Sequence, residues 1–506
     1  DALNYSRLTH ALYNIDNDNS ENEINLSYFL KFATYYLKNN HNDNLLLYYE
    51  QLVSITTLGL LNQRINDIRL LLKEESLSDI NYNNYNWLEI LYIEVMRLYL
   101  LIVRQGKGFK DIDTINEKID KLIEIQEEKE ELMIEEGNLS QREIGQLVIL
   151  YNTIAALSDA KQYLEKGQPD QINVKLDRYL DNIKEGFASG VDARFQYSIE
   201  NIVKGIKLTV KNSIWKQLKT GTRMDQFVEE MVARGNEKPL FQLLPSQVDA
   251  FQEGIDRPLT SAIVIQMHTS AGKSFLAHFL IAQTLQMDDK GQIAYVVPTR
   301  ALVHQSLYDL RNTFKNMDYN IEATIPAYEI DKAEEELLDE KIDILVTTPE
   351  KLNLLVRSNH RSVKKLSFVI VDEAHNISDT TRGPALEFLL ATLKRKNEYI
   401  RTVLLTPFIK DDSNRELIAH WLGRDRGLPV YSKWRPTRQI ISLVKRYKPE
   451  ADRYYKFSLE TIRPDQMDDS EDYPEFEEEI TFPSPKPSSL QSMATAMAKR
   501  FIIKGA

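Results

Sequence analysis

Cysteine is absent from this 506-residue sequence, which excludes disulfide bonds, thiolate metal sites and cysteine nucleophiles. The absence also fits an intracellular chain, and we expect a cytoplasmic location. The eight histidines are scattered and include no HExxH-like pair. A long uncharged apolar run is missing too. The most apolar long segment, residues 87–103, carries Glu89, Glu94 and Arg97 at helical spacing, so it predicts an amphipathic core helix and no membrane partner.

An excess of positive charge is also missing. The formal net charge is −12, so the surface as a whole does not indicate binding to nucleic acid. Any such binding has to be confined to a local cleft. With 42% hydrophobic residues the chain has enough apolar material for large cores, and its length predicts two or three domains.

The segment AIVIQMHTSAGKSF, residues 262–275, is the strongest signal in the sequence. A short apolar run, a loop of small residues, Gly-Lys-Ser and an apolar helix form the pattern of a phosphate cradle. Lys273 is expected to reach the outer phosphates, and the Ser274 hydroxyl is expected to ligate Mg²⁺. Met267 stands where this motif usually has glycine. The alternative interpretation is an ordinary strand-to-helix turn. The candidate nucleotide-binding residues are Thr269, Ser270, Ala271, Gly272, Lys273 and Ser274.

Residues 1–234 predict an all-helical domain. Apolar positions recur at helical spacing in residues 45–61, 65–72, 88–103, 115–133, 144–164, 174–183 and 199–218. No catalytic constellation occurs there. We interpret this part as either a partner-docking or regulatory domain, or a plain helical accessory domain.

The pattern changes near Gly235. Up to about Arg438, short apolar runs alternate with helical stretches, which predicts a doubly wound parallel sheet with ligands at the carboxyl ends of its strands. The predicted strands are residues 262–266, 293–297, 344–347, 368–371 and 403–406. Residues 439–488 are acidic and then rich in proline and serine, which predicts an extended linker. Residues 489–506 predict the first helix of a further domain.

Two adjacent carboxylates follow the fourth of these strands, in the run FVIVDEAH at residues 368–375. Asp372 is a candidate Mg²⁺ ligand, and Glu373 is a candidate base that orients and deprotonates the attacking water. A lone Asp-Glu pair after a strand is usually a solvated turn. Together with the Gly-Lys-Ser loop on another strand of the same sheet, it is a much more specific signal than either motif alone.

These motifs resemble those of superfamily 2 DExH helicases, in the branch with the Ski exosome helicase, archaeal repair helicases and spliceosomal unwinding enzymes. The resemblance covers about residues 240–438 and rests on the order and spacing of seven runs. They are LPSQ at 244–247, PTRAL at 298–302, TTPEKL at 347–352, VDEAH at 371–375, TRGPALE at 381–387, WLG at 421–423 and WRP at 434–436.

The resemblance implies an α/β RecA-like P-loop domain that uses ATP and Mg²⁺, the latter on Ser274 and Asp372. It also implies 3′-to-5′ movement on single-stranded or tailed duplex nucleic acid. Gln247 would read the adenine edge, while His375 and Thr406 would couple the nucleotide to the strand. The residues that would grip the nucleic-acid backbone are Pro298, Thr299, Arg300, Thr347, Thr348 and Pro349.

The sequence departs from the family at two points. The Ser-Ala-Thr motif, which couples hydrolysis to strand separation, aligns with Thr406-Pro407-Phe408, so a ring replaces one hydroxyl. The motifs of a second RecA-like domain, with its arginine fingers, do not occur. We therefore expect this chain to be a fragment that ends where the second domain begins.

Two hypotheses remain open. The first is an ATP-dependent helicase or translocase. The second is an ATP-gated nucleic-acid sensor or scaffold whose helical domain holds an effector subunit, with a weak resemblance to antiphage helicase subunits of the Hachiman type. A small-molecule kinase on a P-loop is disfavoured, since it leaves the DEAH and TTPE runs unexplained.

The missing arginine fingers lead to a first prediction. An arginine finger accelerates phosphoryl transfer by roughly 10³–10⁵, so the 506-residue chain should bind ATP weakly and hydrolyse it poorly. Steady-state phosphate release measures this. Turnover comparable to that of a complete helicase would contradict the prediction.

Overall fold

The structure is a computed structural model. It describes residues 44–74, 85–105, 140–218, 222–233, 239–257, 259–287, 291–324, 342–379, 382–409 and 412–436, the strands at 441–447, 455–462 and 480–482, and isolated positions between 117 and 127. Contacts divide the chain into two compact units; the described residues up to Pro436 belong to the first, and the strands from Ile441 onward belong to the second. We describe each unit by itself.

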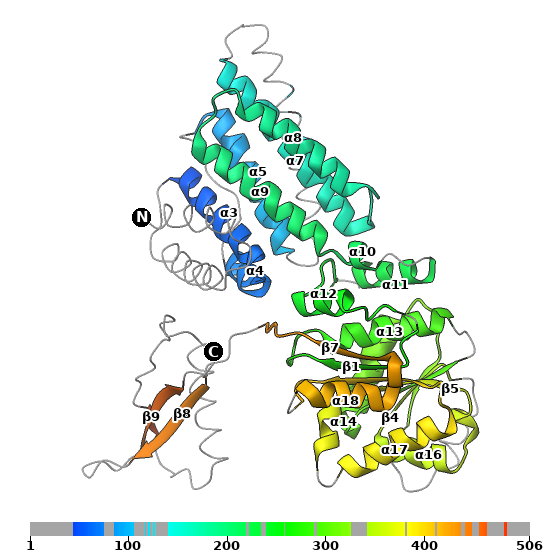
Figure 1. The fold of residues 1–506 in the computed structure, drawn as a ribbon. Helices are drawn as coiled ribbons and strands as arrows, with labels where there is room; N and C mark the ends of the chain where they lie inside the picture. The colour runs from blue at the N-terminus through cyan, green and yellow to red at the C-terminus, as the bar shows by residue number, and fades with distance from the viewer. Residues whose placement is uncertain are drawn as a thin grey trace. The chain divides into compact units, whose positions relative to one another are not determined.

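The N-terminal part of the first unit is helical, as predicted (Figure 1). The side chains of Asn86 and Ser140 cap α5 and α7 in reciprocal capping boxes with Glu89 and Glu143, which explains where these two helices begin. The predicted helix at residues 115–133 lies outside the described residues, apart from isolated positions. The helices of this part are α3 (Leu45–Leu61), α4 (Ile65–Glu74), α5 (Trp87–Arg104), α7 (Gln141–Lys166), α8 (Ile172–Phe187) and α9 (Ala193–Lys211).

Three of these helices meet at a glycine. The Tyr99 hydroxyl on α5 is hydrogen-bonded to the Thr57 hydroxyl on α3 at 2.8 Å, and Thr57 donates to the Asn201 carbonyl on α9 at 3.0 Å. A Cβ at Gly205 would lie only 2.0 Å from the Tyr99 hydroxyl. The helices can approach this closely because position 205 has no side chain.

The helix predicted over residues 199–218 is interrupted. Helix α9 ends at Lys211, and a short α10 (Ile214–Gln217) begins after Ser213, whose hydroxyl accepts a hydrogen bond from Lys216 N–H at 3.2 Å. Ser213 also forms an isolated antiparallel bridge with Gln242. This long-range pairing breaks the helix, and helical periodicity does not reveal it.

The boundary expected at residue 234 does not separate two cores. Helix α11 (Thr222–Ala233) buries Phe227, which stacks on Phe275 at 6.3 Å and on Phe314 at 6.0 Å between ring centroids. These partners belong to the sheet domain. Because the apolar face of α11 joins that core, residues from about 214 pack with the sheet domain, and the expected boundary is about twenty residues too late.

A seven-stranded, all-parallel sheet forms the centre of the sheet domain, in the order β3-β4-β2-β5-β6-β1-β7. The prediction of a doubly wound α/β domain after an all-helical part is therefore confirmed. The strands are β1 (Ala262–Gln266), β2 (Gln292–Val296), β3 (Ile321–Ala323), β4 (Ile344–Thr347), β5 (Leu366–Val371), β6 (Arg401–Thr406) and β7 (Gly427–Tyr431).

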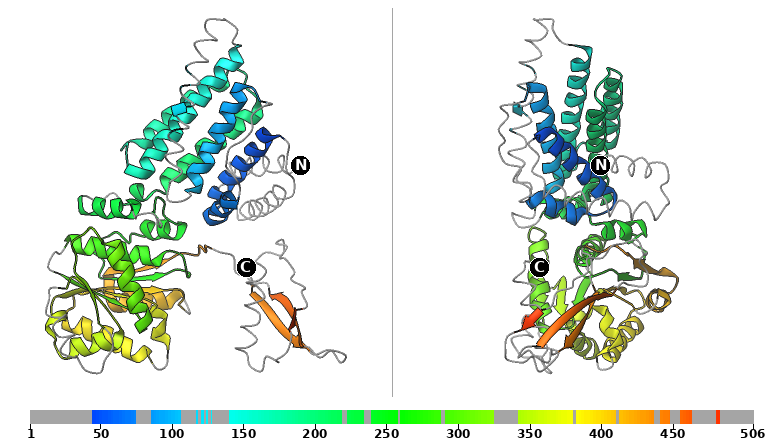
Figure 2. Two further views of the ribbon diagram at one scale, coloured as in Figure 1. Left: turned by 180° about the vertical axis from the view of Figure 1, so that it is seen from behind. Right: turned by 90° about the vertical axis from the view of Figure 1, so that its left-hand side faces the viewer.

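Helices cover both faces of this sheet (Figures 1 and 2). One core contains side chains of α12 (Pro245–Gln252), α13 (Lys273–Met287) and α14 (Arg300–Thr313). The other contains side chains of α16 (Pro349–Arg357), α17 (Gly383–Lys396) and α18 (Asp412–Gly423). A parallel sheet buried on both faces explains the nearly continuous apolar runs of its central strands.

The five predicted strands are all present, and those at residues 262–266 and 344–347 have the predicted bounds. Strand β2 is shifted by one residue, while β5 and β6 begin two residues earlier than predicted. Strands β3 and β7 were not predicted. The first has only three residues, and the second contains Pro429, which an edge strand tolerates.

The second unit contains an antiparallel sheet in the order β10-β9-β8, so the expectation of an extended linker over residues 439–488 was wrong for these strands. They are β8 (Ile441–Tyr447), β9 (Tyr455–Ile462) and β10 (Ile480–Phe482). The period-two alternation in YKFSLETI indicates such a strand. The acidic run at residues 465–479 and the expected helix at 489–506 lie outside the described residues.

The contact at Gly205 gives a stability prediction. Gly205→Ala should lower the free energy of unfolding by about 1–3 kcal/mol, because the new methyl group overpacks the Tyr99 contact. Thermal unfolding followed by circular dichroism measures this. The double variant with Tyr99→Phe should recover part of the loss. An unchanged melting temperature in Gly205→Ala would contradict the proposed close packing.

Candidate active site

The carboxyl ends of the parallel strands bring the candidate residues to one edge of the sheet. The Gly-Lys-Ser loop follows β1, Pro298 follows β2, Thr348 follows β4, Asp372 follows β5, and Thr406 ends β6. Because β5 and β6 lie between β2 and β1, the two carboxylates and Thr406 lie between the loop and the segments expected to contact nucleic acid.

The Lys273 ammonium folds back onto its own loop. It donates to the carbonyl oxygens of Met267 at 3.0 Å and His268 at 3.1 Å, and Ala271 N–H donates to the same His268 carbonyl at 3.2 Å. Burial lowers the pKa of Lys273, while Glu373 and Asp372 act in the opposite direction. The lysine, the loop and the two carboxylates are thus one electrostatic cluster.

Helix α12 supports this loop from one side. Ser246 donates to the Ala271 carbonyl at 2.7 Å, and the Gln247 amide donates to the Gly272 carbonyl at 3.1 Å while accepting from Leu244 N–H at 2.7 Å. Gln247 is only 2% exposed. The structure therefore places Gln247 as a buried support of the loop, and its expected contact with adenine stays a prediction.

Two loop residues have left-handed backbone conformations. Gly272 has φ +86°, and a Cβ there would lie 2.3 Å from the Gln247 amide nitrogen. Ser270 has φ 62°, a region that residues with a side chain adopt at a cost. The loop thus needs glycine at position 272, whereas position 270 carries strain.

Asp372 is held from three directions. Its backbone N–H donates to the Val296 carbonyl at 2.8 Å, and its carboxylate accepts from Glu373 N–H at 2.8 Å and from the Tyr295 hydroxyl at 3.2 Å. Tyr295 is buried, and burial followed by the charge of Asp372 raises its pKa well above the usual value. Its hydroxyl therefore stays protonated and acts as a donor. The Tyr295 hydroxyl thus fixes Oδ2 of Asp372, while the Glu373 N–H fixes Oδ1.

Glu373 connects Asp372 to the run Thr406-Pro407-Phe408 through a series of side-chain contacts. It has a left-handed backbone (φ 52°), and its carboxylate lies 3.2 Å from His375 Nδ1. The His375 ring packs on the Phe408 ring, with centroids 5.2 Å apart and an interplanar angle of 38°. The Thr406 hydroxyl donates to the Phe408 carbonyl at 2.7 Å. A ring contact thus occupies the place of the hydroxyl that the family motif usually has.

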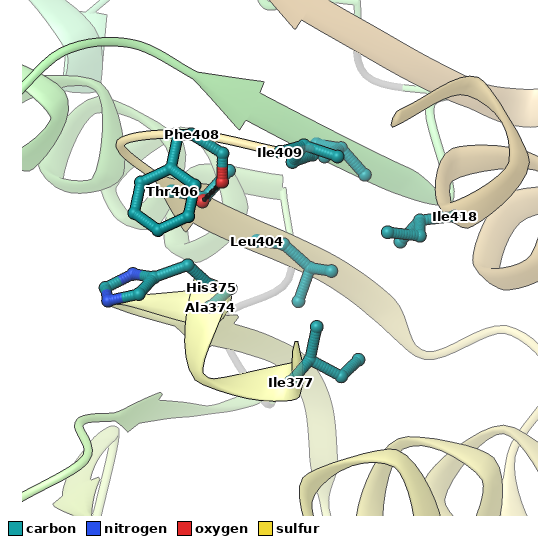
Figure 3. Close-up of a pocket in the computed structure, with 9 residues that line it drawn as sticks. Ala374, His375, Ile377, Leu404, Thr406, Phe408, Ile409 and Ile418 are labelled. Atoms are coloured by element: carbon teal, nitrogen blue, oxygen red, sulfur yellow. Dashed lines mark hydrogen bonds between the residues drawn. The ribbon is translucent and has the colours of Figure 1, made fainter. Parts of the chain in front are cut away.

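An apolar cavity of about 350 Å³ lies beside this contact. Figure 3 shows the His375 and Phe408 rings facing each other at one side, with aliphatic side chains of β6, α18 and the turn after Glu373 along the rest of the wall. Its lining consists of Val264, Ala374, His375, Ile377, Leu404, Thr406, Phe408, Ile409 and Ile418.

The residues expected to grip nucleic acid fall into two groups. Thr299 and Arg300 are exposed at the start of α14, and the Thr299 hydroxyl caps that helix by accepting from Leu302 N–H at 3.4 Å. Thr347 and Thr348 are buried, at 0% and 1% exposure, and Thr347 is hydrogen-bonded to Thr324 at 2.8 Å. The expected contact of Thr347 and Thr348 with the nucleic-acid backbone stays a prediction, and in this structure neither side chain is exposed. Pro349 is half-buried at the start of α16.

Three residues that support the nucleotide loop or Asp372 were not predicted from the sequence. Ser246 and Tyr295 contact the loop and Asp372 from other elements, and Arg435 Nε donates to His268 Nε2 at 2.9 Å across 167 positions of sequence. Ser246 and Arg435 belong to runs singled out for the resemblance, LPSQ and WRP. Their partners become apparent only from the packing.

The residues present fit a magnesium nucleotide. Mg²⁺ is usually held by one or two protein oxygens together with phosphates and waters, so Ser274 and Asp372 suffice, and an all-protein cage is not needed. Within the described residues there is no cluster of three or more acidic or histidine ligands. No helix in the described part of the chain is long and apolar enough to cross a membrane.

Comparisons with known proteins agree with this geometry. Residues 245–411 match the family model described as DEAD/DEAH box helicase. The ATP-dependent DNA helicase Hel308 of Methanocella arvoryzae is 32% identical over 201 residues, which is 39% of this chain and 25% of that protein. The Hachiman protein HamB of Bacillus cereus is 28% identical over 207 residues, which is 40% of this chain and 18% of that protein.

The matched region thus spans about a quarter or less of these relatives. Among solved structures, the DUF1998 helicase MrfA bound to DNA matches 40% of this chain and 27% of that chain, at 16% identity and a TM-score of 0.32. The superfamily 2 helicase resemblance is confirmed by the family match and the Hel308 similarity.

The two loop residues with positive φ give opposite predictions for stability. Gly272→Ala should lower the free energy of unfolding by about 1–2 kcal/mol or more, from backbone strain plus the Gln247 contact. Ser270→Gly should not lower it, because the strain at position 270 is relieved. Chemical denaturation of both variants measures the difference. Equal losses in the two variants would contradict the described loop conformation.

Proposed function

We propose that this chain, whose residues 245–411 form a DEAD/DEAH box helicase domain, is the ATP-binding part of a nucleic-acid helicase or translocase. The proposal rests on the placement of the Lys273 loop and the two carboxylates at the carboxyl ends of β1 and β5, two strands of one sheet with only β6 between them. The family match and the Hel308 similarity support it.

In this proposal the loop residues from Thr269 to Ser274 hold the phosphates of ATP. The first N–H groups of α13 have no partner within the helix and carry partial positive charge. The Lys273 ammonium leaves the Met267 and His268 carbonyls and contacts the outer phosphates. Ser274 and Asp372 would hold Mg²⁺, which would supply positive charge beside the phosphates.

Glu373 orients the attacking water and accepts its proton. A change at the Glu373 carboxylate is transmitted to the end of β6 through His375, which lies beside that carboxylate, and through the Phe408 ring that packs on His375. The nucleic-acid backbone contacts Thr299 and Arg300 at the start of α14, which present N–H groups and positive charge without reading bases. The nucleic-acid backbone also contacts Pro349 at the start of α16. It does not contact the hydroxyls of the two preceding threonines, because these are buried. Movement is 3′ to 5′, by resemblance to the Ski-like branch.

The second candidate is an ATP-gated nucleic-acid sensor whose helical part holds an effector subunit in antiviral defence. The observation that favours it is the Thr406-Pro407-Phe408 run, in which one hydroxyl is replaced by a ring and the other is bonded to the Phe408 carbonyl. The similarity to the Hachiman protein HamB supports the defence role.

A strand-displacement assay on the full-length protein separates the two candidates. ATP-dependent displacement of a 3′-tailed duplex supports a helicase, whereas ATPase activity stimulated by nucleic acid without displacement supports a sensor.

Glu373→Gln should lower hydrolysis at least about 100-fold, since it removes the general base, while nucleotide binding persists. The matched control is Glu416→Gln, which removes an exposed carboxylate on α18 outside the motifs named above. Full hydrolysis by Glu373→Gln would sink the proposal.

A further inference from the structure

The segment from Tyr431 to Pro436, here called the exit segment, leads out of the sheet domain after its last strand. It is hydrogen-bonded to helix α12 and to Glu253, the residue that caps the C-terminus of that helix. Tyr431 N–H donates to the Glu253 carboxylate at 3.2 Å, and the Ser432 hydroxyl donates to the Asp249 carboxylate at 2.6 Å. Helix α12 is also the helix that holds the carbonyls of the nucleotide loop. The exit segment therefore shares a support with that loop.

The exit segment also contacts the nucleotide loop directly. Arg435 Nε donates to His268 Nε2 at 2.9 Å, which requires His268 to be neutral at that nitrogen. Burial is the largest cause of a lowered pKa at His268, and the charges of Arg435 and Lys273 lower it further. The backbone carbonyl of His268 accepts from both Lys273 and Ala271. Fixing the His268 side chain thus restrains the carbonyl on which Lys273 rests.

The other side of the exit segment faces the helical part of the unit. The Trp434 indole N–H donates to the Gln63 carbonyl at 3.0 Å, and the Asn66 amide donates to the Pro436 carbonyl at 3.4 Å. Gln63 lies in the turn between α3 and α4, with φ 57°. Trp434 and Arg435 are adjacent, yet one contacts the helices and the other contacts the nucleotide loop.

We propose that Arg435 is a positioning residue for the nucleotide loop, and that the exit segment transmits the state of that loop to the α3–α4 turn through Trp434. The inference rests on the proposed nucleotide site. When nucleotide draws Lys273 from the His268 carbonyl, the loop shifts, and Arg435 carries the shift to Trp434. The conformation of the α3–α4 turn thereby depends on whether nucleotide is bound. The contacts that connect the two do not involve the residues proposed to bind nucleic acid.

Fluorine NMR of the full 506-residue chain labelled with 5-fluorotryptophan tests this proposal. The chain has four tryptophans, and Trp434→Phe assigns the relevant resonance. Saturating Mg²⁺·ADP should shift the Trp434 resonance in the unsubstituted protein and should leave it unshifted in Arg435→Gln. The dissociation constant for ADP should rise about fivefold in Arg435→Gln, which is the net size of one typical intramolecular hydrogen bond.

Lys433→Gln is the matched control, because it removes the same charge from an exposed side chain in the same segment. It should retain both the Trp434 shift and the affinity for ADP. An ADP-induced Trp434 shift of equal size in Arg435→Gln would overturn the proposal while leaving the nucleotide site intact. Absence of ADP binding to the unsubstituted protein at millimolar concentration would instead overturn the proposed function, and this coupling with it.

Discussion

The parallel pairing of the central strands is the constraint on which the rest of the structure depends. Strand β1 pairs in register with both β6 and β7, and β2 pairs with both β4 and β5. Parallel strands have their carboxyl ends at the same edge, so loops far apart in the sequence meet there. The nucleotide loop, the two carboxylates and the start of α14 come together for this reason. Side chains that support them then come from neighbouring elements, such as Tyr295 on β2 and Ser246 on α12.

Much of this arrangement could be predicted from the sequence. The runs at residues 262–266 and 344–347 are apolar, short and followed by loop residues, and both strands have the predicted bounds. The functional motifs were placed correctly at strand ends, because strand, motif and helix follow one another locally along the chain. The burial of individual side chains could not be predicted from the local sequence pattern. Gln247, Thr347 and Thr348 belong to recognisable motifs, yet their exposure depends on how α12, β3 and α16 pack.

Long-range pairing explains the remaining differences. The bridge from Ser213 to Gln242 interrupts a segment with helical periodicity, and Phe227 joins the core of the sheet domain although its helix resembles those before it. In the second unit, the alternating residues of β9 indicate a strand, although an acidic run follows them in the sequence. Composition describes a whole segment, whereas a strand needs only a few alternating residues and a partner.

Around the candidate site, two contacts link separate elements: the His375 ring after β5 packs on the Phe408 ring after β6, and Arg435 donates to His268 in the nucleotide loop. The central claim is that the loop after β1 binds a magnesium nucleotide. A crystal structure with Mg²⁺ and a non-hydrolysable ATP analogue at millimolar concentration tests it most directly. We expect phosphates on the loop, with the Lys273 ammonium moved from the Met267 and His268 carbonyls to a phosphate oxygen. A nucleotide bound elsewhere, or a Lys273 still bonded to those carbonyls beside a bound nucleotide, would contradict it.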